Sequence, residues 1–202
     1  VIPSFGEYPK LLPYTLDSWL VQLGVDKKNI PYKVIPPKKW SNDFLEAKTN
    51  EWKTKKRKFK KNKWKVIVEG KVQSPVLVYN LNTLLSLAGT ELWPDLKNKI
   101  LVLEQMKASL DTEERLLNQL KLIGTFEIIN GLIISKPESY SSENATFSYE
   151  ELLLEVVGKE RKYPIISCFD CGHTVPMITL PQGIEVKIVA NKNKCDFVLQ
   201  EF

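Results

Sequence analysis

Histidine, cysteine and glycine are scarce in this chain of 202 residues, and each scarcity excludes some classes of protein or of functional site. The single histidine, His173, must serve any mechanism that takes an imidazole from this chain. Three cysteines are too few to hold a fold together through disulfides, so we expect a reducing, cytoplasmic location. No apolar run approaches the roughly 18–20 residues that span a bilayer, and we therefore expect no membrane partner.

Hydrophobic residues make up 43% of the chain and charged residues 26%, which excludes a fully disordered protein. With this length, the composition suits one domain with an appendage or two small domains. Because the chain begins at Val1 rather than at methionine, we expect a fragment or a processed product.

Positive charge is concentrated in residues 53–65, which we call the basic segment. It holds nine of the 29 Lys and Arg residues and no acid, leaving 20 cations against 24 acids elsewhere. Interleaved with Phe59 and Trp64, these cations are typical of a contact for phosphate or nucleic acid. The alternative is a solvated linker, which dense like charge favours. We expect the linker, and no nucleic-acid partner.

Hydrophobic periodicity predicts strands alternating with helices from about residue 64 to 168, followed by a β-rich tail. Strands are expected at 65–69, 75–79, 100–103, 132–134, 164–168, 185–189 and 196–199. Helices are expected at about 16–23, 81–88, 116–123 and 152–157, with N-terminal caps at Thr15, Asn80, the pair Asp111 and Glu114, and the pair Ser148 and Glu151. Residues 25–63 show no regular core. The sequence therefore predicts an α/β domain with a mixed sheet.

The segment Cys168-Phe-Asp-Cys171-Gly-His173 suggests several kinds of site. As a zinc site it lacks a second pair of ligands, and a haem attachment would need the histidine directly after the second cysteine. A thioredoxin-type pair would need a following helix, which Gly172 and Pro176 prevent. Two small buried thiols flanking a turn fit better, so we expect no metal and no other cofactor.

Two residues at predicted strand ends are candidates for acid–base chemistry. His173 follows a strand in a loop, where α/β proteins present reactive side chains, although a structural histidine is an alternative. Glu104 ends the apolar run 100–103, where it can orient an imidazole or simply be solvated. None of the twelve serines lies in a Gly-x-Ser-x-Gly turn, so no nucleophile is recognised.

Several separated motifs occur together in one order along the chain. They are PSFGE at 3–7, NLNTLL at 80–85, AGTELWP at 88–94, ILVLE at 100–104, FDCGHTVP at 169–176 and TLPQG at 179–183. In order and spacing they resemble the LD-carboxypeptidase family of serine peptidases, most closely the microcin C self-immunity branch. The resemblance extends from Val1 to about Leu199.

The resemblance implies a two-domain enzyme in which an upstream domain carries the nucleophilic serine. Residues 1–60 would then be the tail of that domain with the basic interdomain linker. Residues 61–202 would form the C-terminal domain, a swivelling β/β/α-type domain with a mixed sheet. Matching the motifs makes Glu104 the orienting acid and His173 the base. The nucleophile would lie before Val1, so this chain alone should hydrolyse nothing. A homodimer without metal is also implied.

The resemblance further implies a substrate that is either a murein peptide with an L,D-peptide bond or an amide joining a peptide to a nucleotide. Trp52 matches a tryptophan that stacks on the nucleotide, although it could instead pin its loop to the domain. Asn80 and Lys107 match substrate-binding positions. The family usually has two glycines where this chain has Val78-Tyr79, and an aspartate at Gln105. These departures leave a second hypothesis, a non-catalytic relative that binds a peptide or nucleotide.

Overall fold

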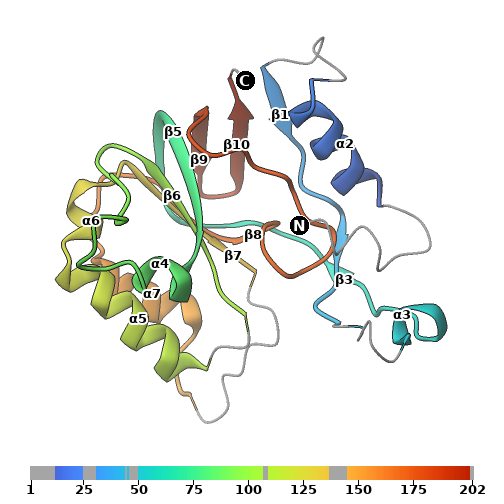
Figure 1. Cartoon of the computed structure of the whole chain (residues 1–202), viewed down its shortest axis with the longest axis horizontal. Helices are drawn as coiled ribbons and strands as arrows, with labels where there is room; N and C mark the ends of the chain where they lie inside the picture. The colour runs from blue at the N-terminus through green and yellow to red at the C-terminus, as the bar shows by residue number, and fades with distance from the viewer. Residues whose placement is uncertain are drawn as a thin grey trace.

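A computed structural model describes residues 12–24, 31–43, 45, 50–106, 109–136 and 145–200 of the chain, Trp52 without its side chain. Their central feature is an eight-stranded sheet in the order β1-β10-β9-β5-β6-β7-β8-β4 (Figure 1). The strands are β1 (Tyr32–Val34), β4 (Lys65–Val68), β5 (Gly70–Asn80), β6 (Ile100–Glu104), β7 (Gly131–Ser135), β8 (Ile165–Phe169), β9 (Glu185–Asn191) and β10 (Lys194–Leu199). A separate short pair is formed by β2 (Lys39–Trp40) and β3 (Lys60–Lys61).

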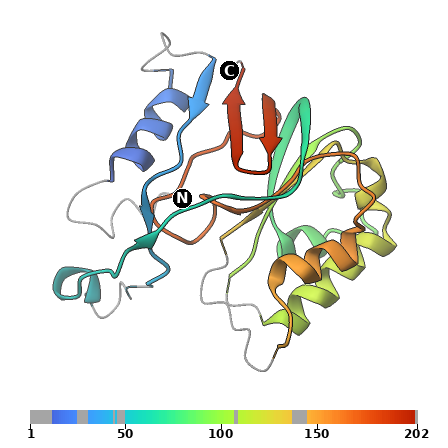
Figure 2. The same ribbon diagram turned by 180° about the vertical axis from the view of Figure 1, so that it is seen from behind.

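The four strands β5 to β8 are parallel, whereas every other neighbouring pair in the sheet is antiparallel. Parallel neighbours need crossover connections, which here contain helices. These are α4 (Leu81–Leu85), α5 (Leu110–Leu122), α6 (Thr125–Ile128) and α7 (Tyr149–Val157). The helices lie together on one side of the sheet in both ribbon views (Figures 1 and 2). The predicted α/β class with a mixed sheet is confirmed.

Side chains of β6 alternate between two hydrophobic cores. Leu101 and Leu103 pack with the helices α4 to α7, whereas Ile100 and Val102 pack on the opposite face. This alternation follows from the two-residue period of a strand, and it explains why the whole run 100–103 is apolar. The core on the second face is aromatic, with the rings of Trp64, Phe169 and Phe197 in mutual contact.

Two predicted helix starts are wrong and two are confirmed. Ser109, not Asp111, is the N-cap of α5, because the backbone is still extended at Ser109 and already helical at Leu110. Helix α2 (Pro13–Gln22) begins before Thr15, since a proline suits the first helical position. Asn80 caps α4 as predicted. Ser148 forms the predicted capping box of α7. None of the helices described here is long and apolar enough to cross a membrane.

The prediction that residues 25–63 contribute no regular structure to the core is wrong for the residues of this range that the structure describes. Besides β2, β3 and the short helix α3 (Glu51–Thr54), this region contributes β1, which pairs with β10 at the edge of the main sheet. Val34 in β1 is buried in the aromatic core. Three residues are too short a strand to show a periodicity. The proposed division of the chain at residue 60 stays a prediction.

Candidate active site

The carboxyl ends of the parallel strands bring two polar side chains to one edge of the sheet. Asn80 is the last residue of β5 and Glu104 the last residue of β6, and the parallel register pairs them directly. Crevices at the carboxyl ends of parallel strands are the usual place for ligands in α/β proteins. This edge of the sheet is therefore a candidate active site.

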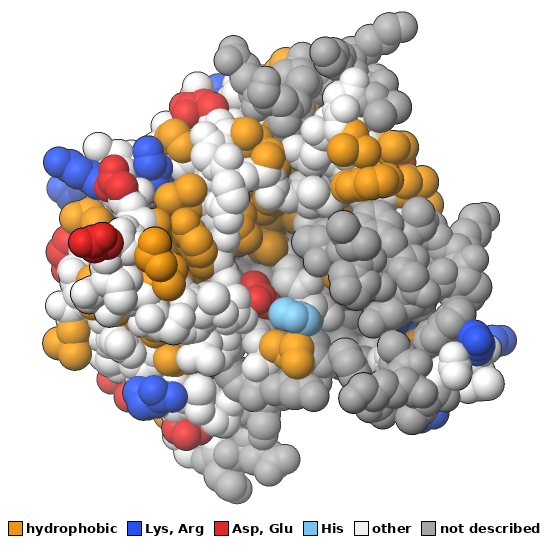
Figure 3. Space-filling model, viewed as in Figure 1, with side chains coloured by type: hydrophobic (Ala, Val, Ile, Leu, Met, Phe, Trp, Pro, Cys, Tyr) orange, Lys and Arg blue, Asp and Glu red, His pale blue; other side chains and the backbone are white. Residues whose placement is uncertain are grey.

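His173 reaches the same edge from the loop that follows β8. Its Nδ1 lies 2.8 Å from Oε2 of Glu104. The side chain of Glu104 is only 11% exposed, whereas that of His173 is 46% exposed, so the carboxylate is shielded while the imidazole reaches the surface. In Figure 3 the histidine lies on the surface beside an acidic side chain. With Nδ1–H donated to Glu104, the neutral ring carries its lone pair on Nε2.

Asn80 fixes the other oxygen of Glu104. Its Nδ2 donates to Oε1 of Glu104 at 2.7 Å, while its Oδ1 accepts the backbone N–H of Thr83 at 3.0 Å as the cap of α4. Both oxygens of Glu104 are therefore engaged, one by Asn80 and one by His173. In this structure Asn80 positions the acid, and its predicted contact with substrate stays a prediction.

Gly172 allows the histidine loop to approach Glu104. Its φ is +89°, and a Cβ atom at this position would lie 2.8 Å from Oε2 of Glu104. A larger residue would thus meet both backbone strain and a steric clash. The sequence shows a glycine beside His173, but not that its hydrogen faces the carboxylate.

A buried charged network holds the start of this loop. Lys136 forms an ion pair with Asp170 and donates to the carbonyl of Cys168 at 2.6 Å. Trp64 Nε1 donates to Oδ2 of Asp170 at 2.6 Å, and Asn62 Nδ2 donates to both carboxylate oxygens. Burial lowers the pKa of Lys136 and raises that of Asp170, and their mutual attraction opposes both shifts. Sequence reasoning missed this network.

The far side of the loop is closed by backbone hydrogen bonds. The N–H of Ile178 donates to the carbonyl of Asp170 at 2.7 Å. Val175 exchanges two backbone hydrogen bonds with Ser41, at 2.8 and 3.0 Å. His173 is therefore presented by a loop that backbone hydrogen bonds hold on both sides of the histidine.

Residues 73–188, more than half of the chain, match the LD-carboxypeptidase C-terminal domain. Over 196 residues the chain is 36% identical to the microcin C7 self-immunity protein MccF of Escherichia coli, covering 96% of this chain and 56% of MccF.

The chain belongs to the LD-carboxypeptidase family.

Solved structures place it in the MccF-like branch of that family. The structure of MccF in complex with glutamyl sulfamoyl guanosine superposes with a TM-score of 0.87 at 34% identity, over all of this chain and 59% of that one. An MccF-like protein from Bacillus anthracis gives a TM-score of 0.81 at 30% identity, over 98% of this chain and 59% of that one. The chain thus spans little more than half the length of these relatives. The predicted family and branch are confirmed.

The cysteines of this LD-carboxypeptidase domain are free thiols. Burial raises the pKa of Cys171 and of Cys195 to about 12 and also raises that of Cys168, so all three are protonated near neutral pH. Within the described ranges, no group of three or more His, Cys, Asp and Glu side chains is arranged to hold a metal ion. Cys171 is buried as predicted, whereas Cys168 is only partly buried, so the prediction of two buried thiols is wrong for Cys168.

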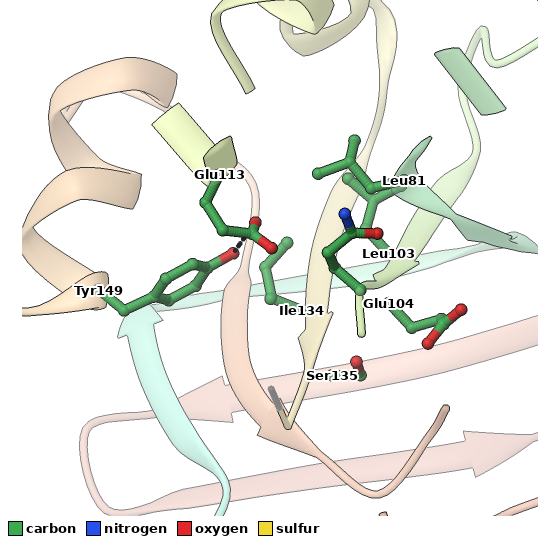
Figure 4. Close-up of a pocket in the computed structure, with 8 residues that line it drawn as sticks. Leu81, Leu103, Glu104, Glu113, Ile134, Ser135 and Tyr149 are labelled. Carbon is green, nitrogen blue, oxygen red and sulfur yellow. Dashed lines mark hydrogen bonds between the residues drawn. The ribbon is translucent and has the colours of Figure 1, made fainter. Parts of the chain in front are cut away.

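A small pocket lies behind Glu104 and contains a second carboxyl group (Figure 4). Glu113 of α5 is 3% exposed, and its Oε2 lies 3.2 Å from the hydroxyl of Tyr149. Burial raises its pKa to about 7, and the charge of Glu104 contributes to the rise. Sequence reasoning missed Glu113, although its place three residues before Leu116 and four before Leu117 puts it on the apolar stripe of the helix.

Two predicted substrate-binding residues of the LD-carboxypeptidase site are not placed by the structure. Lys107 lies outside the described residues. Trp52 belongs to α3, but its side chain also lies outside what is described. Their roles stay predictions that rest on the family resemblance.

Proposed function

We propose that this chain supplies the general base and the orienting acid of a serine-type carboxypeptidase. The observation that carries the proposal is the 2.8 Å contact between His173 Nδ1 and Glu104 Oε2 at the carboxyl edge of the sheet. Serine hydrolases need this pairing because a hydroxyl is a weak nucleophile until a base removes its proton. Membership of a family of carboxypeptidases supports hydrolysis as the reaction class.

In the proposed reaction, Nε2 of His173 accepts the proton of a serine hydroxyl as its oxygen attacks the scissile carbonyl. Glu104 stabilises the imidazolium that forms, because its carboxylate stays ionised and accepts a hydrogen bond from Nδ1–H. The imidazolium then donates a proton to the leaving amine, and water releases the acyl group in a second round of the same proton transfers. Asn80 keeps Glu104 in place throughout these steps, since its amide fixes the oxygen that His173 does not use.

The serine would come from polypeptide outside this chain. This part of the proposal rests on the family resemblance and on the chain spanning 56% of MccF. The chain alone should then show no hydrolysis. The resemblance also suggests a homodimer and a cytoplasmic location.

For the substrate, we propose an amide whose acyl or amine part is a peptide: an L,D-peptide bond of murein, or a bond between a peptide and a nucleotide. The second class is supported by the structure of MccF in complex with glutamyl sulfamoyl guanosine. Trp52 would stack on the nucleotide, and Asn80 and Lys107 would contact polar groups of the substrate.

The test uses the intact protein, consisting of this chain and the polypeptide encoded directly upstream, beside the 202-residue chain alone. Both are incubated with glutamyl sulfamoyl guanosine and with a murein tetrapeptide, and product is measured by mass spectrometry. We expect hydrolysis by the intact protein only, and a fall in kcat of about 10⁶-fold for His173→Ala. Full activity of His173→Ala would refute the proposed base. Tight binding without hydrolysis by the unmodified intact protein would instead support the non-catalytic alternative.

A further inference from the structure

A second cleft opens between three segments that are far apart in the sequence. It is lined by residues 33–38, which run from β1 into the following loop, by residues 61–64, which run from the end of β3 toward β4, and by residues 193–196 at the turn of the β9–β10 hairpin. In Figure 2 these segments appear in blue, teal and red around the hairpin turn. The cleft measures about 620 Å³ and shares no lining residue with the pocket at Glu104.

The walls of this cleft carry an excess of positive charge. Its lining includes one acid, Asp196, and five lysines, which are Lys33, Lys38, Lys61, Lys63 and Lys194. Asp196 is shared by two of them, lying 2.9 Å from Lys33 and 3.3 Å from Lys194. The other three lysines are exposed and form no ion pair with any carboxylate of the described residues.

The positions of Lys61 and Lys63 follow from the alternation of an extended chain. The side chains of Asn62 and Trp64 both donate to Asp170 in the interior. Neighbouring side chains of an extended segment alternate in direction, so Lys61 and Lys63, which flank Asn62, project away from that interior, and both are exposed. The C-terminal end of the basic segment thus contributes positive charge to the lining of the cleft.

The floor of the cleft is apolar and fixed in place. Val34, Pro36, Pro37 and Trp64 contribute to the lining. The Trp64 ring packs on Phe169 with centroids 4.5 Å apart, and Asn62 Nδ2 donates to the carbonyl of Pro37 at 2.8 Å, joining two of the three walls. A cleft with rigid walls loses little entropy when a ligand binds.

We propose that this cleft binds a phosphate ester with an apolar body. Several lysines around one cleft favour a phosphate ester over a carboxylate, because the ester carries nearly two negative charges near neutral pH and a lysine binds phosphate as a point charge. The apolar floor provides a surface for the organic part of the ligand, and the volume falls in the usual range for small-molecule sites, roughly 300–1,000 Å³. The proposal is independent of the His173–Glu104 pair.

The test titrates 1-naphthyl phosphate into the ¹⁵N-labelled 202-residue chain and follows ¹H–¹⁵N NMR shifts. We expect the shifts to concentrate at residues 33–38, 61–64 and 193–196. The double variant Lys61→Glu/Lys63→Glu should weaken binding at least about tenfold. The control Lys97→Glu/Lys159→Glu makes the same change of charge at two exposed lysines outside the cleft and should change binding less than about twofold. Circular dichroism establishes that both variants are folded.

Two further ligands test separately whether the cleft recognises the phosphate group and the apolar body. Inorganic phosphate and 1-naphthol should each bind at least about tenfold more weakly than the ester, since each lacks one half of the recognised chemistry. Equal loss of binding in the two double variants would overturn the proposal, as would equal binding of inorganic phosphate. The proposal would also be overturned if the shifts centred on Glu104 and His173, or if no binding were seen. Much tighter binding of a single-stranded oligonucleotide through the same lysines would overturn it as well.

Discussion

Nδ2 of Asn80 and Oε1 of Glu104 lie 2.7 Å apart where two neighbouring parallel strands end. The same asparagine caps α4 through its Oδ1, which accepts the N–H of Thr83. One side chain therefore links the start of a helix to the orientation of the acid that contacts His173. The stabilising role of Asn80 and its role in the proposed catalysis can be separated, because they use different atoms of one amide.

Replacing Asn80 with serine should separate these two roles. Serine is a good N-cap, so the free energy of unfolding should fall by less than about 1 kcal/mol, whereas Asn80→Ala should cost about 1 kcal/mol more. Serine cannot replace the amide contact with Glu104, so kcat of the intact protein should fall about 10- to 100-fold in both variants. Urea unfolding and steady-state kinetics measure the two effects. Unchanged kcat in Asn80→Ser would show that the amide does not position Glu104.

Gly172→Ala should destabilise the protein more than Gly183→Ala does. Both glycines have positive φ, +89° and +80°, so both variants carry the strain of a left-handed backbone, about 1–2 kcal/mol. Only at Gly172 would the new Cβ lie 2.8 Å from Glu104, while nothing lies within 4 Å at Gly183. We expect an additional loss of about 1–3 kcal/mol in thermal unfolding for Gly172→Ala. Equal losses would contradict the close approach of the two residues.

Glu113→Gln should change how stability depends on pH. The pKa of Glu113 is raised from 4.5 to about 7 in the folded protein, so the folded state holds a proton that the unfolded state releases. The contribution of Glu113 to the free energy of unfolding is complete below pH 4.5. It falls by about 3 kcal/mol as the pH rises from 4.5 to 7. The variant should therefore be more stable than the unmodified protein at pH 8.

The matched control for this prediction is Glu114→Gln, on the same helix but exposed. Its unfolding free energy should follow that of the unmodified protein between pH 5 and pH 8 to within about 0.5 kcal/mol. If Glu113→Gln shows the same pH dependence as Glu114→Gln, the folded-state pKa of Glu113 is not raised.

Lys136→Met should be among the most destabilising single changes in the domain. It leaves the buried carboxylate of Asp170 without its cation, at a cost of about 3–5 kcal/mol. Adding Asp170→Asn should recover part of the loss, since a neutral amide needs no counter-charge but can still accept from Trp64. Chemical denaturation of the single and double variants measures this coupling. Purely additive losses would show that the two charges do not depend on each other.

Local patterns were sufficient where a single segment determines its own structure. The apolar run 100–103 is a strand buried on both faces, and Ser148 with Glu151 closes a capping box, both as predicted. Glu104 directly follows the predicted strand 100–103, and His173 lies in the loop after the predicted strand 164–168. Both residues could therefore be recognised from sequence as candidates at strand ends. Their 2.8 Å contact needed the sheet order, because 69 residues separate them in sequence.

Features that depend on distant partners could not be predicted. Lys136 and Asp170 appear in sequence as ordinary charged residues, and only the fold shows that they are buried together. β1 is too short to carry a pattern and is stabilised by pairing with β10, more than 160 residues later. The roles of Trp52 and Lys107 rest on resemblance alone, since the described residues do not include their side chains.

The pairing of β1 with β10 also bears on how the chain can be shortened. Cutting at residue 60 would remove Tyr32–Val34 and uncover a row of backbone N–H and C=O groups along the last strand. The buried position of Val34 beside the aromatic core would open to water at the same time. A piece that begins after residue 60 would thus present β10 as an open strand edge, through which separate molecules associate.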